Sequence, residues 1–320
     1  MDIVCLGELL IDMFPAEIGR RLVEVSAFHP KPGGAPANVA VAAARLGAQS
    51  AFIGKVGDDA FGHFLIDTLA REQVETRGMR LDESTRTTLV FIALIDENTP
   101  EFVFYRNPGA DMMLRADELD HNLLQQAKVF HFGSISLIEE PSRRATIEAV
   151  RLARQSGALV SFDVNYRPSL WPNSDEAYRL IMTMLPQVNL VKVNRDELAL
   201  LSGSTDLEAG SQALLQHGPD LGVVTLGPDG SYFRLADGGE HIPGFRVQTV
   251  DAVGCGDAFT AGLLTQLVAG NQRPETLASS TLRPILRYAN AVGALTATKQ
   301  GVIPALPAWQ DVEAFLKSSQ

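Results

Sequence analysis

The stretch KVFHFGSISLIEEPSRRATIEAVRLARQSGALVSFDVN (residues 128–165) joins two short apolar runs through a longer, more polar segment. The runs KVFHFGS and LVSFDVN are rich in Val, Leu and Phe, which is typical of strands that are buried on both faces. Residues 140–156, which lie between them, have the length and the spacing of a helix. A strand, a helix and a strand in this order predict a parallel pair with a crossover helix.

The same alternation recurs on both sides of this stretch. Helical patterns such as 37–47 and 59–72 follow further strand-like runs, which are DIVCLG (2–7), SAFIGKV (50–56), VNLVKVN (188–194) and LGVVTLG (221–227). Repetition of this unit predicts an α/β fold, a doubly wound and mainly parallel sheet flanked by helices on both faces. In such folds, ligands bind beyond the carboxyl ends of the strands.

One region breaks the alternation. The runs TLVFIALI (88–95) and FVFYR (102–106) are separated by a connection too short for a crossover helix, and they therefore predict a hairpin. The run RRLVEVSAF (20–28) is a further candidate strand. We expect a single catalytic domain over 1–320, with a small β lid contributed by about 13–30 and 86–107.

Composition excludes several classes of function. A formal net charge of −11 and a pI near 5.0 would repel nucleic acids and anionic membranes, so neither is expected as a partner. The cysteines, Cys5 and Cys255, are too few for a disulfide framework, and the N-terminus lacks the cationic region of a signal peptide. These features predict a cytoplasmic location. No P-loop, G-x-G-x-x-G or H-E-x-x-H motif occurs.

The segment DAVGCGD (251–257) predicts a glycine turn that leads into a helix, because the apolar stretch AFTAGLLTQLV follows it. Uncovered amide N–H groups at the start of a helix form a site for an anion such as a phosphate. Asp257 would repel that anion, so its presence favours a second task, which is to accept the proton of a hydroxyl that attacks the phosphoryl group. The alternative is that Asp257 is merely an acid that the helix dipole favours.

A second segment, KPGGAPANVAVAAARLG (31–47), combines paired glycines with a helix of small residues. At Gly33 and Gly34 the backbone can approach a polyol closely, and the amide of Asn38 can bond to its hydroxyls. A tight turn with a close-packed helix explains the alanines but not Asn38, because Asn is a poor helix former. Asp12, which follows the first strand, could accept hydrogen bonds from neighbouring sugar hydroxyls, although a structural role is equally compatible with the sequence.

These two segments, in this order and spacing, resemble the two signatures of the ribokinase-like (phosphofructokinase B) family of carbohydrate kinases, and the resemblance covers essentially the whole chain. Four further stretches are similar to the fructokinase subgroup: FYRNPGADMML (104–114), FHFGSISLIEEPSR (130–143), SFDVNYRPSLWP (161–172) and KQGVIPALP (299–307). The resemblance implies an ATP-dependent kinase that phosphorylates the 6-hydroxyl of D-fructose. The alternatives are a 2-keto-3-deoxygluconate kinase and a catalytically silent, fructokinase-like scaffold subunit.

The resemblance also implies roles for individual residues. Asp257 would be the general base, and the backbone amides would form an anion hole at Gly254, Cys255 and Gly256. The sugar would be held by Asp12, Gly33, Gly34 and Asn38, with Arg106 reaching in from the lid hairpin.

The nucleotide and its ions are expected on the other side of the anion hole. The family pattern Asn-x-x-Glu matches Asn194 and Glu197, which implies that Glu197 organises Mg²⁺ through water. The expected nucleotide-binding residues are Lys192, Asn194, Thr225, Gly227, Gly230, Gly256 and, at the adenine, Asn290. Asp251, Val253 and Gly301 resemble a monovalent-cation loop, so K⁺ is expected besides ATP and Mg²⁺.

Two features depart from the family pattern or stay open. Ala252 and Cys255 replace the usual Thr and Ala of the second signature, but an anion hole made of amides should survive both changes. A thiol at a helix N-terminus is expected to have a lowered pKa, which predicts that Cys255 is sensitive to alkylation. Arg167 either pairs with Asp163 as scaffold or reaches the substrate, where it and Arg106 could bind the carboxylate of 2-keto-3-deoxygluconate.

The edges of lid strands often pair with other strands, and family members are commonly dimers. The resemblance therefore implies a homodimer that forms through the lid.

Overall fold

The computed structural model describes residues 1–17, 19–96 and 99–319. Its main element is a nine-stranded sheet with the order β13-β12-β11-β10-β9-β8-β1-β4-β5, in which the seven strands from β5 to β11 are parallel and β12 and β13 are antiparallel. This arrangement confirms the predicted α/β fold. The strands are β1 (Ile3–Leu6), β4 (Ser50–Gly57), β5 (Glu75–Asp82), β8 (Val129–Gly133), β9 (Leu159–Asp163), β10 (Leu190–Asn194), β11 (Leu221–Thr225), β12 (Gly230–Leu235) and β13 (Gly238–Pro243).

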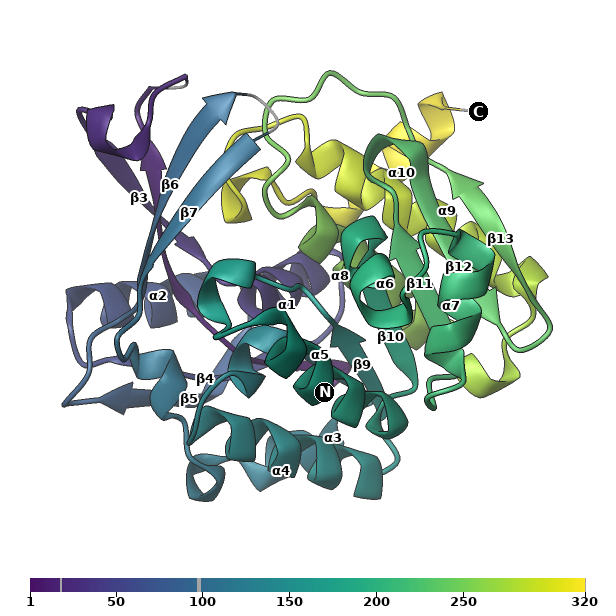
Figure 1. Cartoon of the computed structure of the whole chain (residues 1–320), viewed down its shortest axis with the longest axis horizontal. Coiled ribbons are helices and arrows are strands. Elements are labelled where there is room, and N and C mark those ends of the chain that lie inside the picture. Colours follow the sequence, from purple (N-terminus) through teal and green to yellow (C-terminus); the bar gives the residue numbers. More distant parts are fainter. Residues whose placement is uncertain (18, 97–98, 320) are drawn as a thin grey trace.

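Helices cover both faces of this sheet, so each central strand is buried on both sides (Figure 1). In β1, Ile3 and Cys5 pack into one core, while Val4 and Leu6 pack into the other. The first core includes side chains of α1 (Ala35–Arg45), α2 (Ala60–Arg71), α8 (Cys255–Ala269), α9 (Ser279–Thr296) and α10 (Trp309–Ser318). The second includes side chains of α3 (His121–Gln126), α4 (Ser142–Gln155), α5 (Ser174–Met184), α6 (Arg195–Ser202) and α7 (Leu207–Leu215).

Helix α8 is apolar on nearly all sides because it is packed between α1 and α9. Small residues bring these helices close together: a Cβ added at Gly262 would lie 3.0 Å from Val292 and 3.1 Å from Ala289. Among the residues described, no helix is both long and apolar enough to cross a bilayer. The apolar sequence of α8 therefore reflects burial in the core, and its packing fixes where its first turn lies.

A separate small sheet stands beside the main one (Figure 1). It has the order β3-β2-β6-β7, with β2 (Leu10–Pro15), β3 (Phe28–Gly33), β6 (Leu89–Asp96) and β7 (Thr99–Tyr105). The β6–β7 pair is the hairpin predicted from the sequence, and β2 lies parallel to β6. One face of this sheet packs Leu10, Phe14, Val90 and Ile92 together with Val253, a residue of the DAVGCGD segment.

The prediction of a strand at 20–28 is wrong. The structure forms a short 3-10 helix, η1 (Leu22–Glu24), at this position, and the strand β3 begins only at Phe28. Val23 is 82% exposed. Val23 therefore gains nothing from burial at this position, and β3 is selected by its pairing with β2 instead.

Candidate active site

Asp257 lies in the first turn of α8 and is joined directly to the glycine-rich segment of α1. The Nδ2 group of Asn38 donates a hydrogen bond of 2.8 Å to Oδ2 of Asp257, although the two residues are 219 positions apart in the sequence. Asp257 is only 9% exposed. Burial raises the pKa of its carboxyl to about 6, while the Asn38 bond and the charges of Lys192 and Arg167 act in the opposite direction.

Asp12 shares this environment. Burial and the negative charge of Asp257 raise the pKa of Asp12 to about 7, whereas Arg167 lowers it. A Cβ at Gly33 would lie 2.0 Å from Oδ2 of Asp12, so only glycine leaves room for this carboxylate. Gly34 has φ 110°, a left-handed backbone that glycine adopts readily. The structure thus brings together Asp12, both glycines, Asn38 and Asp257.

Arg167 does not pair with Asp163, so the predicted scaffold pairing is wrong. In the described part of the chain, Asp163 is bound instead by Lys192, whose Nζ lies 3.1 Å and 3.0 Å from its two carboxylate oxygens. Arg167 donates to the carbonyl of Tyr166 at 3.3 Å, and its charge lowers the pKa of both Asp12 and Asp257. Arg167 is therefore close enough to the candidate sugar site to influence both carboxylates.

Lys192 lies beneath the glycine turn. A Cβ at Gly256 would be 3.2 Å from its Nζ, so the absence of a side chain at Gly256 lets the ammonium group approach the backbone. Burial alone would lower the pKa of Lys192, but the charges of Asp163 and Glu197 raise it. Lys192 therefore stays protonated and places a positive charge under the start of α8.

The DAVGCGD turn has the geometry of an anion site. Gly254 is the N-cap of α8 with φ 81°, and no side chain caps this helix start. Asp251 braces the turn: its two oxygens accept hydrogen bonds of 2.9 Å from the amides of Val253 and Gly301. The three residues predicted to form a cation loop are thus brought together. The Cys255 amide donates to the carbonyl of Ala252 at 3.4 Å, whereas the amides of Gly254 and Gly256 have no partner among the residues described and can bind a ligand.

The prediction that Cys255 has a lowered pKa is wrong. Burial, followed by the negative charges of Asp251 and Asp257, raises the pKa of the Cys255 thiol to about 12. The helix dipole acts on this thiol as expected, but two nearby carboxylates and a desolvated position outweigh it. Cys255 is therefore a thiol, not a thiolate, at neutral pH.

The predicted nucleotide side is built around Asn194, the N-cap of α6. Its Oδ1 accepts from the amide of Glu197 at 2.8 Å, and Oε2 of Glu197 accepts from the amide of Asn194 at 2.7 Å. The other oxygen of Glu197 accepts from the amide of Tyr166 at 2.7 Å. This reciprocal cap holds a buried carboxylate beside Lys192 and Asp163.

The remaining predicted nucleotide residues border the carboxyl end of β11. The Thr225 hydroxyl donates to the carbonyl of Val193 at 3.3 Å, and Gly227 and Gly230 both have left-handed backbones. Asn290, on α9, donates to the carbonyls of Ile242 and Pro243, at 3.1 Å and 3.2 Å. Its side-chain NH₂ therefore holds β13 against α9, and its contact with adenine stays a prediction.

Arg106 is buried at the root of the hairpin and paired with Asp111. Its Nη2 lies 2.7 Å from Oδ2 of Asp111, and the Thr88 hydroxyl donates to Oδ1 of the same carboxylate at 2.5 Å. This network joins the start of β6 to the segment after β7. Contact between Arg106 and a substrate stays a prediction.

The sequence analysis missed Asp111 and Glu8, and it did not foresee that Asp163 binds Lys192. Glu8 stands in the otherwise apolar run CLGELLI, and a lone acid within a buried run is a signal that could have identified it. Asp111 stands in a segment quoted for its resemblance alone, whereas Asp163 ends the strand-like run LVSFD and was considered only as a partner of Arg167.

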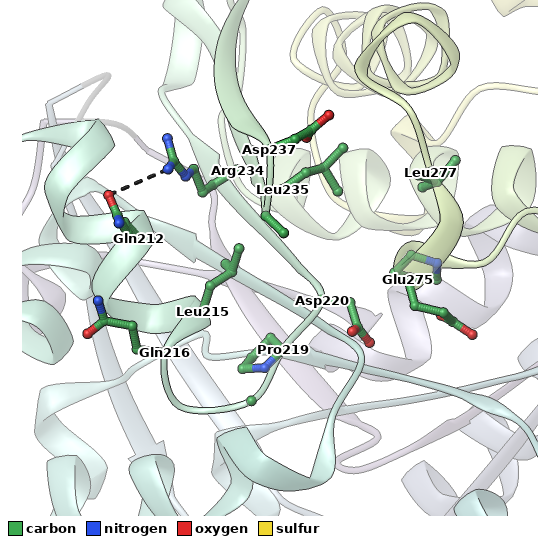
Figure 2. Close-up of a pocket in the computed structure, with 13 residues that line it drawn as sticks. Gln212, Leu215, Gln216, Pro219, Asp220, Arg234, Leu235, Asp237, Glu275 and Leu277 are labelled. Carbon is green, nitrogen blue, oxygen red and sulfur yellow. Dashed lines mark hydrogen bonds between the residues drawn. The ribbon is translucent and has the colours of Figure 1, made fainter.

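Cavities found elsewhere do not coincide with this cluster. Figure 2 shows a cavity of about 540 Å³ at the opposite edge of the sheet, where β11 begins rather than where it ends. The residues that line this cavity are Gln212, Leu215, Gln216, Gly218, Pro219, Asp220, Arg234, Leu235, Ala236, Asp237, Pro274, Glu275 and Leu277.

Among the residues described, no group of three or more His, Cys, Asp or Glu side chains could hold a metal ion.

The comparisons with known proteins identify the family of this chain. Residues 1–309 match the model of the pfkB family carbohydrate kinases. The chain is 45% identical over 317 residues to the protein named probable fructokinase-2 of Arabidopsis thaliana. The aligned region covers 98% of this chain and 95% of that protein. This chain belongs to the pfkB family of carbohydrate kinases.

Solved structures of other carbohydrate kinases are also similar. A fructokinase with bound ATP from Xylella fastidiosa has a TM-score of 0.90 and 35% identity, over 99% of this chain and 98% of that chain. A fructokinase double mutant from Vibrio cholerae O395, bound to fructose, ADP and potassium ion, has a TM-score of 0.89 and 34% identity, over 99% and 98%.

The Asn38–Asp257 bond in this carbohydrate kinase can be tested through the pH dependence of kcat/KM, in which the acid limb reports the ionisation of the base. The Asn38 amide stabilises the ionised form of Asp257, so Asn38→Ala should raise the pKa of this carboxyl. Because the base must be ionised to accept a proton, the acid limb of kcat/KM for the sugar should move to higher pH by about one unit. Asn173→Ala removes only the N-cap of α5 and should leave the limb in place. An unshifted limb in Asn38→Ala would contradict the assignment.

Proposed function

We propose that this chain is an ATP-dependent fructokinase, which transfers the γ-phosphoryl group of ATP to the 6-hydroxyl of D-fructose. The observation that carries the proposal is the bond between Asn38 and Asp257, because it fixes a carboxylate at the head of α8 beside Asp12 and the paired glycines. Relatives named as fructokinases, similar over nearly the whole chain, support the choice of sugar.

In the proposed reaction, the oxygen of the sugar hydroxyl attacks the γ-phosphorus and Asp257 takes its proton. The bond from the γ-phosphorus to the bridging oxygen breaks, and ADP leaves. The amides at Gly254, Cys255 and Gly256 would stabilise the charge that develops on the phosphoryl oxygens, and the Lys192 ammonium beneath them adds to the positive potential. A pKa of about 6 makes Asp257 a stronger base than an ordinary aspartate, while it is still mostly ionised at neutral pH.

ATP and a metal ion are the expected cofactors, and we propose Mg²⁺ and K⁺ specifically. Both oxygens of Glu197 already accept backbone amides, so the carboxylate fits a role in which its remaining lone pairs hold waters of Mg²⁺. When bound, Mg²⁺ would neutralise charge on the phosphates. The negative charge of Asp251, held beside Val253 and Gly301, fits a monovalent cation next to the anion hole.

The alternative of an acidic substrate depended on two free arginines. Arg106 is buried and paired with Asp111, so Arg167 is the one of these two arginines whose charge lowers the pKa of both Asp12 and Asp257. A neutral sugar therefore fits this site better than 2-keto-3-deoxygluconate does. The cytoplasmic location stays a prediction from the sequence.

Substitution of the base is the direct test of the mechanism. Asp257→Asn keeps the shape and can still accept the Asn38 bond, but it removes the proton acceptor, so kcat should fall by about 10²–10⁴-fold. The KM for the sugar should change by no more than about threefold, because ground-state contacts are kept. Steady-state kinetics with a coupled ADP assay would measure both. Asp206→Asn, which changes the N-cap carboxylate of α7, is the matched control. Turnover close to that of the parent would refute the role of Asp257.

A panel of sugars tests the substrate. In the same assay with fructose, 2-keto-3-deoxygluconate, ribose, glucose and tagatose, kcat/KM should be highest for fructose, by about tenfold or more, because a site that bonds specific hydroxyls rejects sugars that place them elsewhere. A higher value for 2-keto-3-deoxygluconate would favour the acidic substrate. No turnover with any sugar would favour the silent scaffold subunit.

We further propose a homodimer that forms through the small sheet. The face opposite its packed core carries an aromatic cluster, with ring centroids of Phe28 and Phe91 5.0 Å apart and those of Phe91 and Tyr105 5.2 Å apart. Tyr105 is 63% exposed. Such an apolar face is suited to burial against a second copy.

Sedimentation equilibrium tests this assembly. The parent should have twice the chain mass of 34.6 kDa, and Tyr105→Glu should shift the equilibrium towards the monomer, because it places a charge in the proposed interface. Tyr178→Glu changes an exposed tyrosine of α5 and should have no effect. A monomeric parent would contradict the proposal.

A further inference from the structure

Glu8 is a buried acid that the mechanism above does not use. It lies in the bend between β1 and β2 and is 3% exposed. Its Oε1 accepts a hydrogen bond of 3.0 Å from the amide of Ala35, while its Oε2 is buried without a hydrogen-bond partner among the residues described. A buried polar atom without a partner is costly, so its presence calls for an explanation.

The hydrogen bond from the Ala35 amide to Glu8 takes the place of an N-cap side chain, which Gly34 lacks. Ala35 is the first residue of α1, and the N-cap, Gly34, has no side chain with which to bind the free amides. Glu8 supplies the oxygen from 27 positions away. The backbone is in contact as well, because a Cβ at Gly34 would lie 2.3 Å from the carbonyl oxygen of Glu8.

The turn that Glu8 caps is connected to the proposed base, Asp257, through Asn38. The amide of Asn38 donates to the carbonyl of Gly34 at 2.8 Å, so Asn38 belongs to the helical turn that Glu8 holds. The side chain of Asn38 then bonds to Asp257. A change at Glu8 would therefore be transmitted to the paired glycines and to the proton acceptor.

Charged groups from two segments act on Glu8. They are Asp111 and Arg106 at the root of the hairpin, and Asp12 of β2, whose own pKa Glu8 raises. Burial and the charge of Asp111 raise the pKa of Glu8 to about 7, although the Ala35 amide and Arg106 act in the opposite direction. Glu8 therefore changes its charge in the pH range in which the protein is expected to work.

We propose that Glu8 is a positioning residue for phosphoryl transfer: one oxygen holds the Gly33–Gly34 loop and the first turn of α1 in register with Asp257, and the second, which has no partner among the residues described, takes up the proton. Glu8 thus links the sugar loop to the Arg106–Asp111 pair without touching the reacting atoms. The proposal rests on the sugar kinase activity proposed above.

Two variants separate this role from ordinary structural support. Glu8→Ala removes the cap, and we expect the KM for fructose to rise and kcat to fall, each about tenfold, with the KM for ATP within about twofold. Glu8→Gln keeps an oxygen for the Ala35 amide and mimics the protonated acid. It should restore the KM for fructose to within about threefold of the parent, and its kcat/KM profile should lose one ionisation near pH 7.

A second readout needs no substrate. Amide hydrogen exchange at Ala35, Ala37 and Asn38 should be at least about tenfold faster in Glu8→Ala than in the parent, because a cap of this strength holds the first turn closed. Asp206→Ala removes the N-cap of α7 and is the matched control, for which exchange at these three amides should be unchanged.

The outcomes also separate this proposal from the proposed function. If the parent phosphorylates fructose but Glu8→Ala has unchanged KM, kcat and exchange, the positioning role is overturned and the proposed function stands. The positioning role would also be overturned if Glu8→Gln and Glu8→Ala were equally impaired, or if the pH profile of Glu8→Gln were the same as that of the parent. The pH profile of Glu8→Gln tests the role even if Glu8→Ala fails to fold. Absence of sugar kinase activity in the parent would overturn the proposed function and, with it, the role of Glu8 in phosphoryl transfer, while hydrogen exchange would still show whether Glu8 caps α1.

Discussion

The hydrogen bond from Asn38 to Asp257 joins the two helix starts on which the candidate active site is built. It can form only because α1 and α8 pack closely, which their small residues permit. An uncharged donor suits this position: it satisfies a buried carboxylate without adding a cation that would lower its pKa strongly. The carboxyl therefore keeps the basicity that burial confers.

The electrostatics of the site follow from this burial. Three acids, Glu8, Asp12 and Asp257, have pKa values raised to between about 6 and 7 by desolvation and by the negative charges of nearby carboxylates. Lys192 offsets part of this charge on the α8 side and is itself held by Asp163. A site with this balance suits a neutral polyol next to a phosphate that arrives with its own cations, which is the charge pattern of sugar phosphorylation by ATP.

Much of the fold could be predicted because burial on both faces leaves a strong signal. Runs such as VFHFG and LVSFD are mainly apolar and buried throughout because helices cover both sides of a parallel strand. The composition of the run 20–28 resembles that of a strand and predicts one wrongly, because β3 is selected by hydrogen bonding to β2. The glycines and Asp257 of the candidate site could be recognised for the same kind of local reason: small residues before a helix expose amides whatever the rest of the chain does.

The sequence by itself determined the layered α/β architecture and the residue types at the two glycine segments, since these depend on local apolar patterning and on backbone freedom. Only the tertiary structure decided which charges meet: that Asp163 binds Lys192 rather than Arg167, that Glu8 caps a helix that begins 27 positions later, and that two carboxylates and burial keep Cys255 protonated. The reason is physical. Electrostatic energies and pKa values depend on distance and desolvation, and both are set by the packing of segments that lie far apart along the chain.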